Sequence, residues 1–273
     1  MTPALAIVIV GYNARDDLER CLASIDARPP AVPFEVLLVD NGSTDGGPDL
    51  VERRWPRVRV LRQARNLGFG AANNVGIHAT DAELVLLLNS DTIVPPGAID
   101  RLVGRLGGAR DVAVAGPRLV SADGEPELSF GRMIGPWNEL RQKALRALVA
   151  RRVPPFPAWL RRRAATEHHP DWVSGACLLV RRADALAAGL FDERFFLYTE
   201  DVDFCAAIRR LGRRVLFTPV AEVVHLGGRS RASAPAATER AYRASQLAFY
   251  AKHHPGWLPW LRAYLRLRGK LPG

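Results

Sequence analysis

Cysteine is scarce in this chain of 273 residues. The three cysteines, Cys21, Cys177 and Cys205, lie far apart and show no metal-ligand spacing, and so small and odd a number argues against a disulfide framework. Long apolar runs are also missing, because the run near the N-terminus is too short to span a bilayer and lacks the basic start of a signal peptide. We therefore expect a protein of the reducing cytosol with no transmembrane anchor.

Acidic side chains are few in two regions. The whole chain has a formal net charge of +10, yet residues 131–170 hold nine basic and two acidic side chains, and residues 251–273 hold five basic side chains and no acidic one. Both regions contain amphipathic, tryptophan-bearing segments of the kind that lies on anionic bilayers. A solvated basic surface is the alternative. No recognised nucleic-acid-binding module accompanies the charge, so no nucleic-acid partner is expected.

Apolar runs and amphipathic patterns alternate along the first 116 residues. Short β-branched runs predict strands, and apolar residues at helical spacing predict the helices between them. This alternation predicts an α/β fold with a mostly parallel sheet and helices on both faces. The strands are expected at residues 5–10, 34–39, 58–61, 83–88 and 112–115, and the helices at 16–27, 48–54, 71–78 and 98–106.

The alternation breaks after residue 116, where Pro, Arg and Trp crowd residues 131–172. Further strands and helices are nevertheless predicted from the same periodicities. The strands are expected at residues 172–180 and 214–217, and the helices at 137–151, after 182, at 202–211 and at 236–253.

Polar residues follow three of the predicted strands. Tyr12 and Asn13 follow the first, Asp40 ends the second, and the sequence Asn-Ser-Asp at 89–91 follows the fourth. Ligands bind outside the carboxyl ends of the strands in an open parallel sheet, because loops and helix N-termini converge there. One such residue alone is as often a turn former or a helix cap. Three clusters at one edge predict a binding site.

Six motifs carry a family resemblance by their order and spacing. They are VIVGYNARDDLERCLASI, EVLLVDNGSTDGG, RNLGFGAANNVGI, LLLNSDT, WVSGACLLVRR and FDERFFLYTEDVDFCAAIRRLG. Together they resemble the inverting family 2 glycosyltransferases of the GT-A fold, and among them are similar to bacterial rhamnosyltransferases that build cell-wall and surface polysaccharide. The resemblance implies transfer of a sugar, L-rhamnose from dTDP-rhamnose, to a glycan or a polyprenyl-diphosphate-linked acceptor.

The resemblance also implies a division of the chain. Residues 1–230 would form the GT-A domain, with a nucleotide-sugar half at 1–116 and an acceptor and catalytic half at 117–230, and residues 231–273 would form a basic helical tail. A polyprenyl-diphosphate acceptor implies a cytoplasmic enzyme, peripheral on the inner face of the plasma membrane. The sequence leaves open whether the enzyme forms an oligomer.

The implied donor site lies at the predicted edge. Asp40 would hydrogen-bond the pyrimidine base, with Tyr12 and Asn13 beside it. Asn66, in RNLGFG, belongs to the same set.

The acidic metal motif of the family maps onto Asn89, Ser90 and Asp91, of which only Asp91 supplies a carboxylate. One carboxylate can hold Mg²⁺ or Mn²⁺ if the donor's diphosphate and waters fill the other positions. Asn89 departs from the commoner Asp-x-Asp form, which leaves a strict metal requirement open. Some relatives are similar in using a histidine at the place of His225, and imidazole suits Mn²⁺ better than Mg²⁺. A structural histidine is the alternative.

An acceptor hydroxyl is a poor nucleophile near neutral pH, so a carboxylate must take its proton. In TEDVD the resemblance makes Asp201 this base and Glu200 a hydrogen-bonding partner of the acceptor. An acidic cluster that only caps a helix is the alternative. Trp172, Ser174 and Gly175 resemble the acceptor-side wall of the family, where an aromatic face stacks on a sugar. A core tryptophan is the alternative.

Charge develops on the β-phosphate as the leaving group departs, and basic side chains can stabilise it. Arg65, Arg229 and Arg231 are candidates, although loop arginines are commonly solvated. The histidine pairs at 168–169 and 253–254 are expected to be solvated.

Other function classes remain open at this point. A sugar nucleotidyltransferase would need a glycine-rich, basic loop after the first strand, which residues 11–14 do not form. A dinucleotide-binding oxidoreductase is suggested by Gly68 and Gly70, but Asn73 replaces the third glycine of its motif. A non-catalytic nucleotide-binding module is a third alternative. Donors with galactofuranose, N-acetylglucosamine or mannose are also compatible with the motif spacing.

Overall fold

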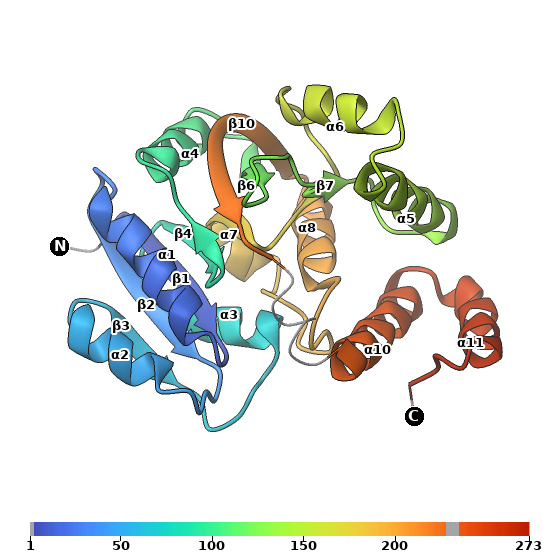
Figure 1. Cartoon of the computed structure of the whole chain (residues 1–273), viewed down its shortest axis with the longest axis horizontal. Helices are drawn as coiled ribbons and strands as arrows, with labels where there is room; N and C mark the ends of the chain where they lie inside the picture. The colour runs from blue at the N-terminus through green and yellow to red at the C-terminus, as the bar shows by residue number, and fades with distance from the viewer. Residues whose placement is uncertain (1–2, 228–234, 273) are drawn as a thin grey trace.

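A central sheet of eight strands organises the residues that this computed structural model describes, 3–227 and 235–272 (Figure 1). The strands are β1 Leu5–Gly11, β2 Phe34–Asp40, β3 Arg59–Arg62, β4 Leu84–Asn89, β5 Thr92–Ile93, β6 Val112–Val120, β9 Cys177–Arg181 and β10 Arg214–His225. Their order is β3-β2-β1-β4-β9-β6-β10-β5. Strand β9 is antiparallel to β4 and β6, and β5 to β10, whereas the remaining pairs are parallel. The predicted α/β fold with a mostly parallel sheet is confirmed.

Helices cover both faces of this sheet (Figure 1). The helices are α1 Arg15–Ala27, α2 Gly47–Arg54, α3 Phe69–His78, α4 Ala98–Gly107, α5 Pro136–Ala150, α6 Phe156–Ala164, α7 Arg182–Ala187, α8 Glu200–Arg210, α10 Pro235–His253 and α11 Leu258–Leu267, of which α5, α10 and α11 lie to one side of the sheet (Figure 1). Side chains of β1 alternate between two cores: Leu5, Ile7 and Ile9 pack with α1 and α4, whereas Ala6 and Val8 pack with α3 and α8. Burial on both faces explains why the strands read as continuous apolar runs.

Several elements differ from the sequence-based expectation. Strand β10 continues to His225, whereas a strand ending at residue 217 was predicted. Pro219 lies within it, and the pairing with β6 shifts register between Thr218 and Glu222, so the apolar pattern is interrupted where the strand goes on. The strand predicted at 172–180 is two strands, β8 Trp172–Val173 and β9, and β8 pairs with a short strand that was not predicted, β7 Phe130–Gly131. Helix α6 was not predicted either.

Helix α10 is joined to the sheet domain by buried carboxylates, although the sequence predicted residues 231–273 as an appended tail. Glu139 of α5 accepts a hydrogen bond of 2.6 Å from the Tyr250 hydroxyl. Asp203 of α8 is buried, with Lys252 Nζ at 2.8 Å and His253 Nε2 at 2.6 Å from its carboxyl oxygens. Asp203 therefore joins α8 to α10 as a buried acid.

The histidine pairs are not generally solvated. His168 is half-buried, with its ring centroid 5.0 Å from that of Phe217, and His254 hydrogen-bonds the carbonyl of Ile134 at 2.8 Å. His253 contacts Asp203 as described. Only His169 is exposed, because the other three rings lie where segments distant in sequence meet.

Of the helices in the part of the chain that the structure describes, none combines the length and the apolar character needed to cross a membrane.

Candidate active site

The polar clusters predicted at one edge of the sheet do lie together. Gly11 of β1 stands level with Asp40 of β2, and Val10 stands level with Asn89 of β4. The residues that follow these strands therefore emerge at the same carboxyl edge, which is where a ligand binds in such a sheet.

The loop after β2 is held by side chains of the predicted donor set. Asp40 is buried and its Oδ1 accepts a hydrogen bond of 2.9 Å from the Ser43 N–H. Asn13 has a positive φ of 47°, and its Oδ1 accepts a hydrogen bond of 2.8 Å from the Thr44 N–H. Tyr12 is 51% exposed beside them. Asp40 thus forms a turn here, and its contact with a base stays a prediction.

Asn41 is a structural member of this edge that the sequence reasoning missed. Its Nδ2 donates to Asn66 Oδ1 at 2.9 Å, and its Oδ1 accepts from the Leu67 N–H at 2.8 Å. Asn66 Oδ1 also accepts from the Gly68 N–H. Gly68 packs so closely that a Cβ would lie 2.4 Å from the carbonyl oxygen of Phe196. This glycine therefore permits a close chain approach, and the dinucleotide motif is not needed to explain it.

Asp91 and His225 meet although 134 positions separate them in the sequence. The short strand β5 pairs with the end of β10, placing Thr92 opposite His225. The Leu226 N–H donates to the Asp91 carbonyl at 2.8 Å, and His225 Nε2 lies 3.4 Å from Asp91 Oδ1. The two side chains predicted as metal ligands are therefore neighbours.

The imidazole of His225 is oriented by Glu127, which the sequence reasoning also missed. Glu127 Oε2 lies 3.0 Å from His225 Nδ1. Burial lowers the pKa of His225, but hydrogen bonds to Asp91 and Glu127 raise it by more, to about 10. A carboxylate that fixes one ring nitrogen of a metal-binding histidine is a common supporting arrangement.

The donor atoms at Asp91 and His225 fit part of a divalent-cation site. Among the described residues, no group of three or more His, Cys, Asp or Glu side chains is arranged to hold a metal ion. One carboxylate and one imidazole leave most coordination positions to other ligands, which matches an ion that also binds a diphosphate. Metal binding at these residues stays a prediction.

The predicted base stands on the other side of the edge. Asp201 lies in the first turn of α8, where negative charge is favoured. Its Oδ2 accepts a hydrogen bond of 3.0 Å from the Gly175 N–H, and its Oδ1 accepts one of 2.8 Å from the Val202 N–H. A Cβ on Gly175 would lie 3.0 Å from the Phe69 ring, so a larger residue there would push the two segments apart.

Glu200 and Asp201 form a pair of adjacent carboxyls with different surroundings. Burial raises the pKa of Glu200 well above its ordinary range, and the charge of Asp201 raises it further. Burial also raises the pKa of Asp201, but the N–H groups of Gly175 and Val202 oppose this shift. Glu200 Oε2 is buried with no hydrogen-bond partner among the described residues. Hydrogen bonds from two N–H groups favour the charged form of Asp201, so Asp201 is the carboxyl of the pair that is better placed to act as a base.

Replacing Glu200 with Gln is expected to raise the melting temperature at about pH 8 and to change it little at about pH 4. In the unfolded chain Glu200 loses its proton above its ordinary pKa of about 4.3, whereas burial raises its pKa in the folded protein. The free energy of unfolding of the natural protein therefore falls as the pH rises from the unfolded pKa to the folded pKa. Glutamine removes that dependence. Thermal unfolding across the pH range measures it, and equal pH slopes for the two proteins would contradict the raised pKa.

The structure also bears on Trp172 and on the arginines that were predicted to stabilise the leaving group. Trp172 is 4% exposed and its indole N–H donates to the Arg132 carbonyl at 2.8 Å, so its ring belongs to the core. The predicted stacking of Trp172 on a sugar is wrong for this structure, because no ring face is open to a ligand. Arg65 is exposed, and Arg229 and Arg231 lie outside the described residues.

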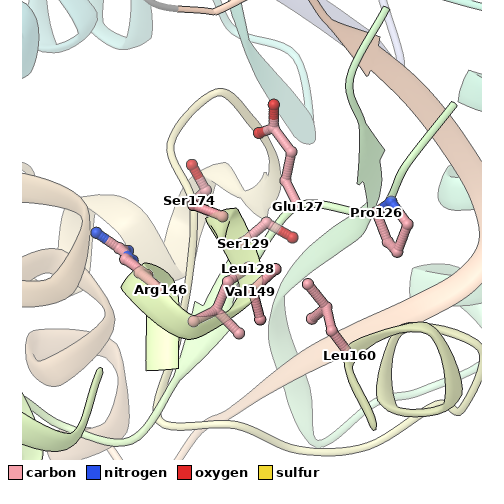
Figure 2. A pocket seen from close by; sticks show the side chains of 9 residues that line it. Pro126, Glu127, Leu128, Ser129, Arg146, Val149, Leu160 and Ser174 are labelled. Atoms are coloured by element: carbon pink, nitrogen blue, oxygen red, sulfur yellow. The ribbon is translucent and has the colours of Figure 1, made fainter. Parts of the chain in front are cut away.

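A cavity of about 360 Å³ lies near both sets of residues (Figure 2). Glu127, which contacts His225, lines it from one side, and Ser174, the neighbour of Gly175, lines it from the other. Arg146 of α5 also reaches the cavity. The described residues that line the cavity do not include Asp91 or Asp201, but a neighbour of each set lines it, so a space shared by the two carboxylates stays a prediction.

A family model described as glycosyl transferase family 2 matches residues 6–169, more than half of the chain. The chain belongs to glycosyltransferase family 2. This membership decides between the function classes that the sequence left open, because it makes the protein a glycosyltransferase.

The family 2 glycosyltransferase is similar to a curated enzyme of Mycobacterium tuberculosis named N-acetylglucosaminyl-diphospho-decaprenol L-rhamnosyltransferase. The two are 36% identical, and the match covers 99% of this chain and 93% of the relative.

Two solved glycosyltransferases show the same fold. GalNAc-T7, in a structure with UDP, GalNAc and Mn²⁺, matches 90% of this chain and 48% of its own with a TM-score of 0.63 at 18% identity. The mannosyltransferase PcManGT of Pyrobaculum calidifontis, in complex with GDP-Man and Mn²⁺, matches 97% of this chain and 69% of its own with a TM-score of 0.61 at 17% identity. The fold of this family 2 glycosyltransferase is GT-A, as the resemblance implied.

Proposed function

We propose that this enzyme is an inverting rhamnosyltransferase that transfers L-rhamnose from dTDP-rhamnose to a sugar linked to a polyprenyl diphosphate. The observation that carries the proposal is the meeting of Asp91 and His225 at the carboxyl edge of the sheet, together with Asp201, whose hydrogen-bond donor Gly175 follows the cavity-lining Ser174. The similarity of this chain, along nearly its whole length, to a rhamnosyltransferase named for N-acetylglucosaminyl-diphospho-decaprenol supports both the proposed donor and the proposed acceptor.

The proposed reaction is a single displacement at the anomeric carbon. Asp201 takes the proton of the acceptor hydroxyl as this oxygen attacks, while the nucleoside diphosphate leaves from the opposite face of the sugar. Glu200, held protonated by burial, donates a hydrogen bond to the acceptor. The nucleotide lies at the edge where Tyr12, Asn13 and Asp40 emerge.

Asp91 and His225 would hold a divalent cation, Mg²⁺ or Mn²⁺. Bound there, the ion would offset the charge that the departing diphosphate carries. Asn66, Asn89 and Ser90 line the same edge and would contact the donor.

A donor screen tests this proposal directly. Release of the nucleoside diphosphate is measured for dTDP-rhamnose, UDP-galactofuranose, UDP-N-acetylglucosamine and GDP-mannose, each with and without N-acetylglucosaminyl-diphospho-polyprenol. We expect acceptor-dependent release to be fastest with dTDP-rhamnose. Faster acceptor-dependent release from another donor would refute the rhamnose assignment, and nucleotide triphosphate consumption would indicate a nucleotidyltransferase.

The C-terminal helix α11 presents an aromatic stripe that we assign to an anionic membrane surface. Trp257, Trp260, Tyr264 and Leu267 recur at intervals of three, four and three residues and are 46–88% exposed. The opposite face packs inward through Leu265. Exposed arginines at 262, 266 and 268 lie on the same helix or directly after it, so the segment combines apolar side chains with positive charge. Such contact would hold the enzyme peripherally at the cytoplasmic face of the plasma membrane, where a polyprenyl acceptor lies.

The combined variant Trp257→Ser, Trp260→Ser and Leu267→Ser should bind anionic vesicles at least about tenfold more weakly, because each buried apolar side chain contributes about 1.5–3 kcal/mol. Co-sedimentation at low salt measures the effect. Val220→Ser is the matched control, because Val220 is an exposed apolar residue of β10, away from α11, and its carbonyl accepts a hydrogen bond from Arg101 of α4. If all three proteins sediment equally with the vesicles, or if the natural protein does not sediment with them, the stripe is a solvated surface and not a membrane-binding one.

A further inference from the structure

The cavity beside Asp201 contains a polar group that the protein itself does not satisfy. Ser129 is 5% exposed and lines the cavity, and its Oγ has no hydrogen-bond partner among the described residues (Figure 2). An unsatisfied buried hydroxyl destabilises a fold by about 1–3 kcal/mol, and such a group calls for a ligand or water. Across the cavity, Ser174 Oγ accepts a hydrogen bond of 3.3 Å from the Ala176 N–H, which leaves its own proton to donate.

Arg146 brings a positive charge to the same cavity. It lies on α5, and in the described part of the chain it forms no ion pair. Its charge acts on Asp201, lowering the pKa of that carboxyl against the larger effect of burial. The guanidinium therefore stands near the base while its donors stay available. A planar guanidinium fork matches the oxygens of a phosphate.

The far wall of the cavity is apolar. Val149, Leu160 and Pro126 line it, and the same three residues line an adjoining cavity of about 510 Å³. Prolines 154, 155 and 157 form part of this second space. The second cavity is mixed, because Ser121, Asp123, Glu125, Arg152 and Arg161 line it as well. The apolar wall that the two cavities share offers contact to the first part of a hydrocarbon chain beyond a phosphate.

We infer that this cavity is the subsite for the diphosphate end of a lipid-linked acceptor, in which Arg146 pairs with the phosphate on the acceptor sugar and Ser129 hydrogen-bonds the sugar itself. The inference rests on the proposed function, since it places the acceptor of that reaction. It adds that the enzyme recognises the diphosphate directly, so an acceptor without phosphate is a poorer substrate.

Two acceptors separate the contributions. One is a short-chain polyprenyl diphosphate bearing N-acetylglucosamine, and the other is an alkyl glycoside of N-acetylglucosamine without phosphate. Arg146→Ala is expected to raise KM for the diphosphate acceptor by about 10–100-fold, the range for a charge-assisted hydrogen bond, and to leave KM for the alkyl glycoside within about twofold. Arg146→Lys should recover part of the loss. Ser129→Ala should raise KM for both acceptors by about 5–10-fold.

Arg141→Ala is the matched control, because Arg141 is an exposed arginine of the same helix that does not line the cavity. Equal losses for both acceptors in Arg146→Ala would mean that Arg146 acts through Asp201, and unchanged kinetics would mean that it does not touch the acceptor. Either result overturns the inference and leaves the proposed function standing.

Calorimetry tests the inference by binding alone, even if this enzyme catalyses a different reaction from the one proposed. The diphosphate acceptor is titrated into the natural protein and Arg146→Ala in the presence of dTDP. Binding at least about tenfold weaker in the variant supports the inference without any turnover, and equal binding overturns it. If no donor yields transfer by the natural protein, the proposed function fails separately.

Discussion

Asp201→Asn is expected to lower kcat for sugar transfer by about 10²–10⁴-fold, the usual contribution of a general base, and to leave nucleotide binding unchanged. The amide has the shape of the carboxyl and can still accept a hydrogen bond from the Gly175 N–H, but it cannot take a proton from the acceptor. Nucleotide release under saturating substrates measures kcat, and calorimetry with dTDP measures binding.

Asp49→Asn provides the matched comparison. Asp49 also lies in the first turn of a helix, α2, but it forms an exposed ion pair with Arg62 away from the cavity. If both acids serve only their helices, the two variants should lose similar small amounts of stability and no activity. Undiminished turnover in Asp201→Asn would remove Asp201 from the role of base.

Asp91→Ala is expected to abolish the dependence of dTDP binding on Mn²⁺ and to slow transfer by about 10²–10³-fold, as removal of one electrostatic stabiliser of the leaving charge commonly does. Asp91 supplies the single carboxylate of the Asn-Ser-Asp motif, and His225 alone leaves one protein ligand. Calorimetry of dTDP with and without Mn²⁺ gives the binding change.

Asn89→Asp is the informative partner of this variant, because it recreates the Asp-x-Asp form while keeping Asp91. It should bind dTDP with Mn²⁺ at least as tightly as the natural protein. If the natural protein binds dTDP equally with and without Mn²⁺, the metal assignment is wrong, whatever the two variants do.

The strands and helices that build the donor edge were predictable because their signals are local. Leu5–Gly11 is an uninterrupted apolar run, and Phe34–Asp40 is apolar apart from Glu35 and the final Asp40, so the polar residues at the strand ends are visible in the sequence. Parallel pairing then brings their ends level, so Asp40 and Asn89 fall at one edge without further information. The pairing of Asp91 with His225 was also anticipated, from motif order and not from periodicity.

Other features escaped because their causes are not local. Trp172 reads equally well as a wall residue and as a core residue, and only its packing shows that the ring is enclosed. Glu127 lies in a turn with no recognisable motif, 98 positions from the His225 ring that it orients. Arg146 looks like any other cation of an amphipathic helix until α5 is placed against the cavity.

The sequence by itself determined the family, the order of the strands along the chain and the candidate carboxylates, since these depend on residue type and spacing along the chain. Only the tertiary structure decided that α10 is tied inward by Glu139 and Asp203, and that Ser129 and Arg146 line one cavity. The physical reason is the separation along the chain of the residues that each feature brings together. Periodicity reports which face of an element is buried, whereas a cavity depends on how loops and helices from distant parts of the chain pack together.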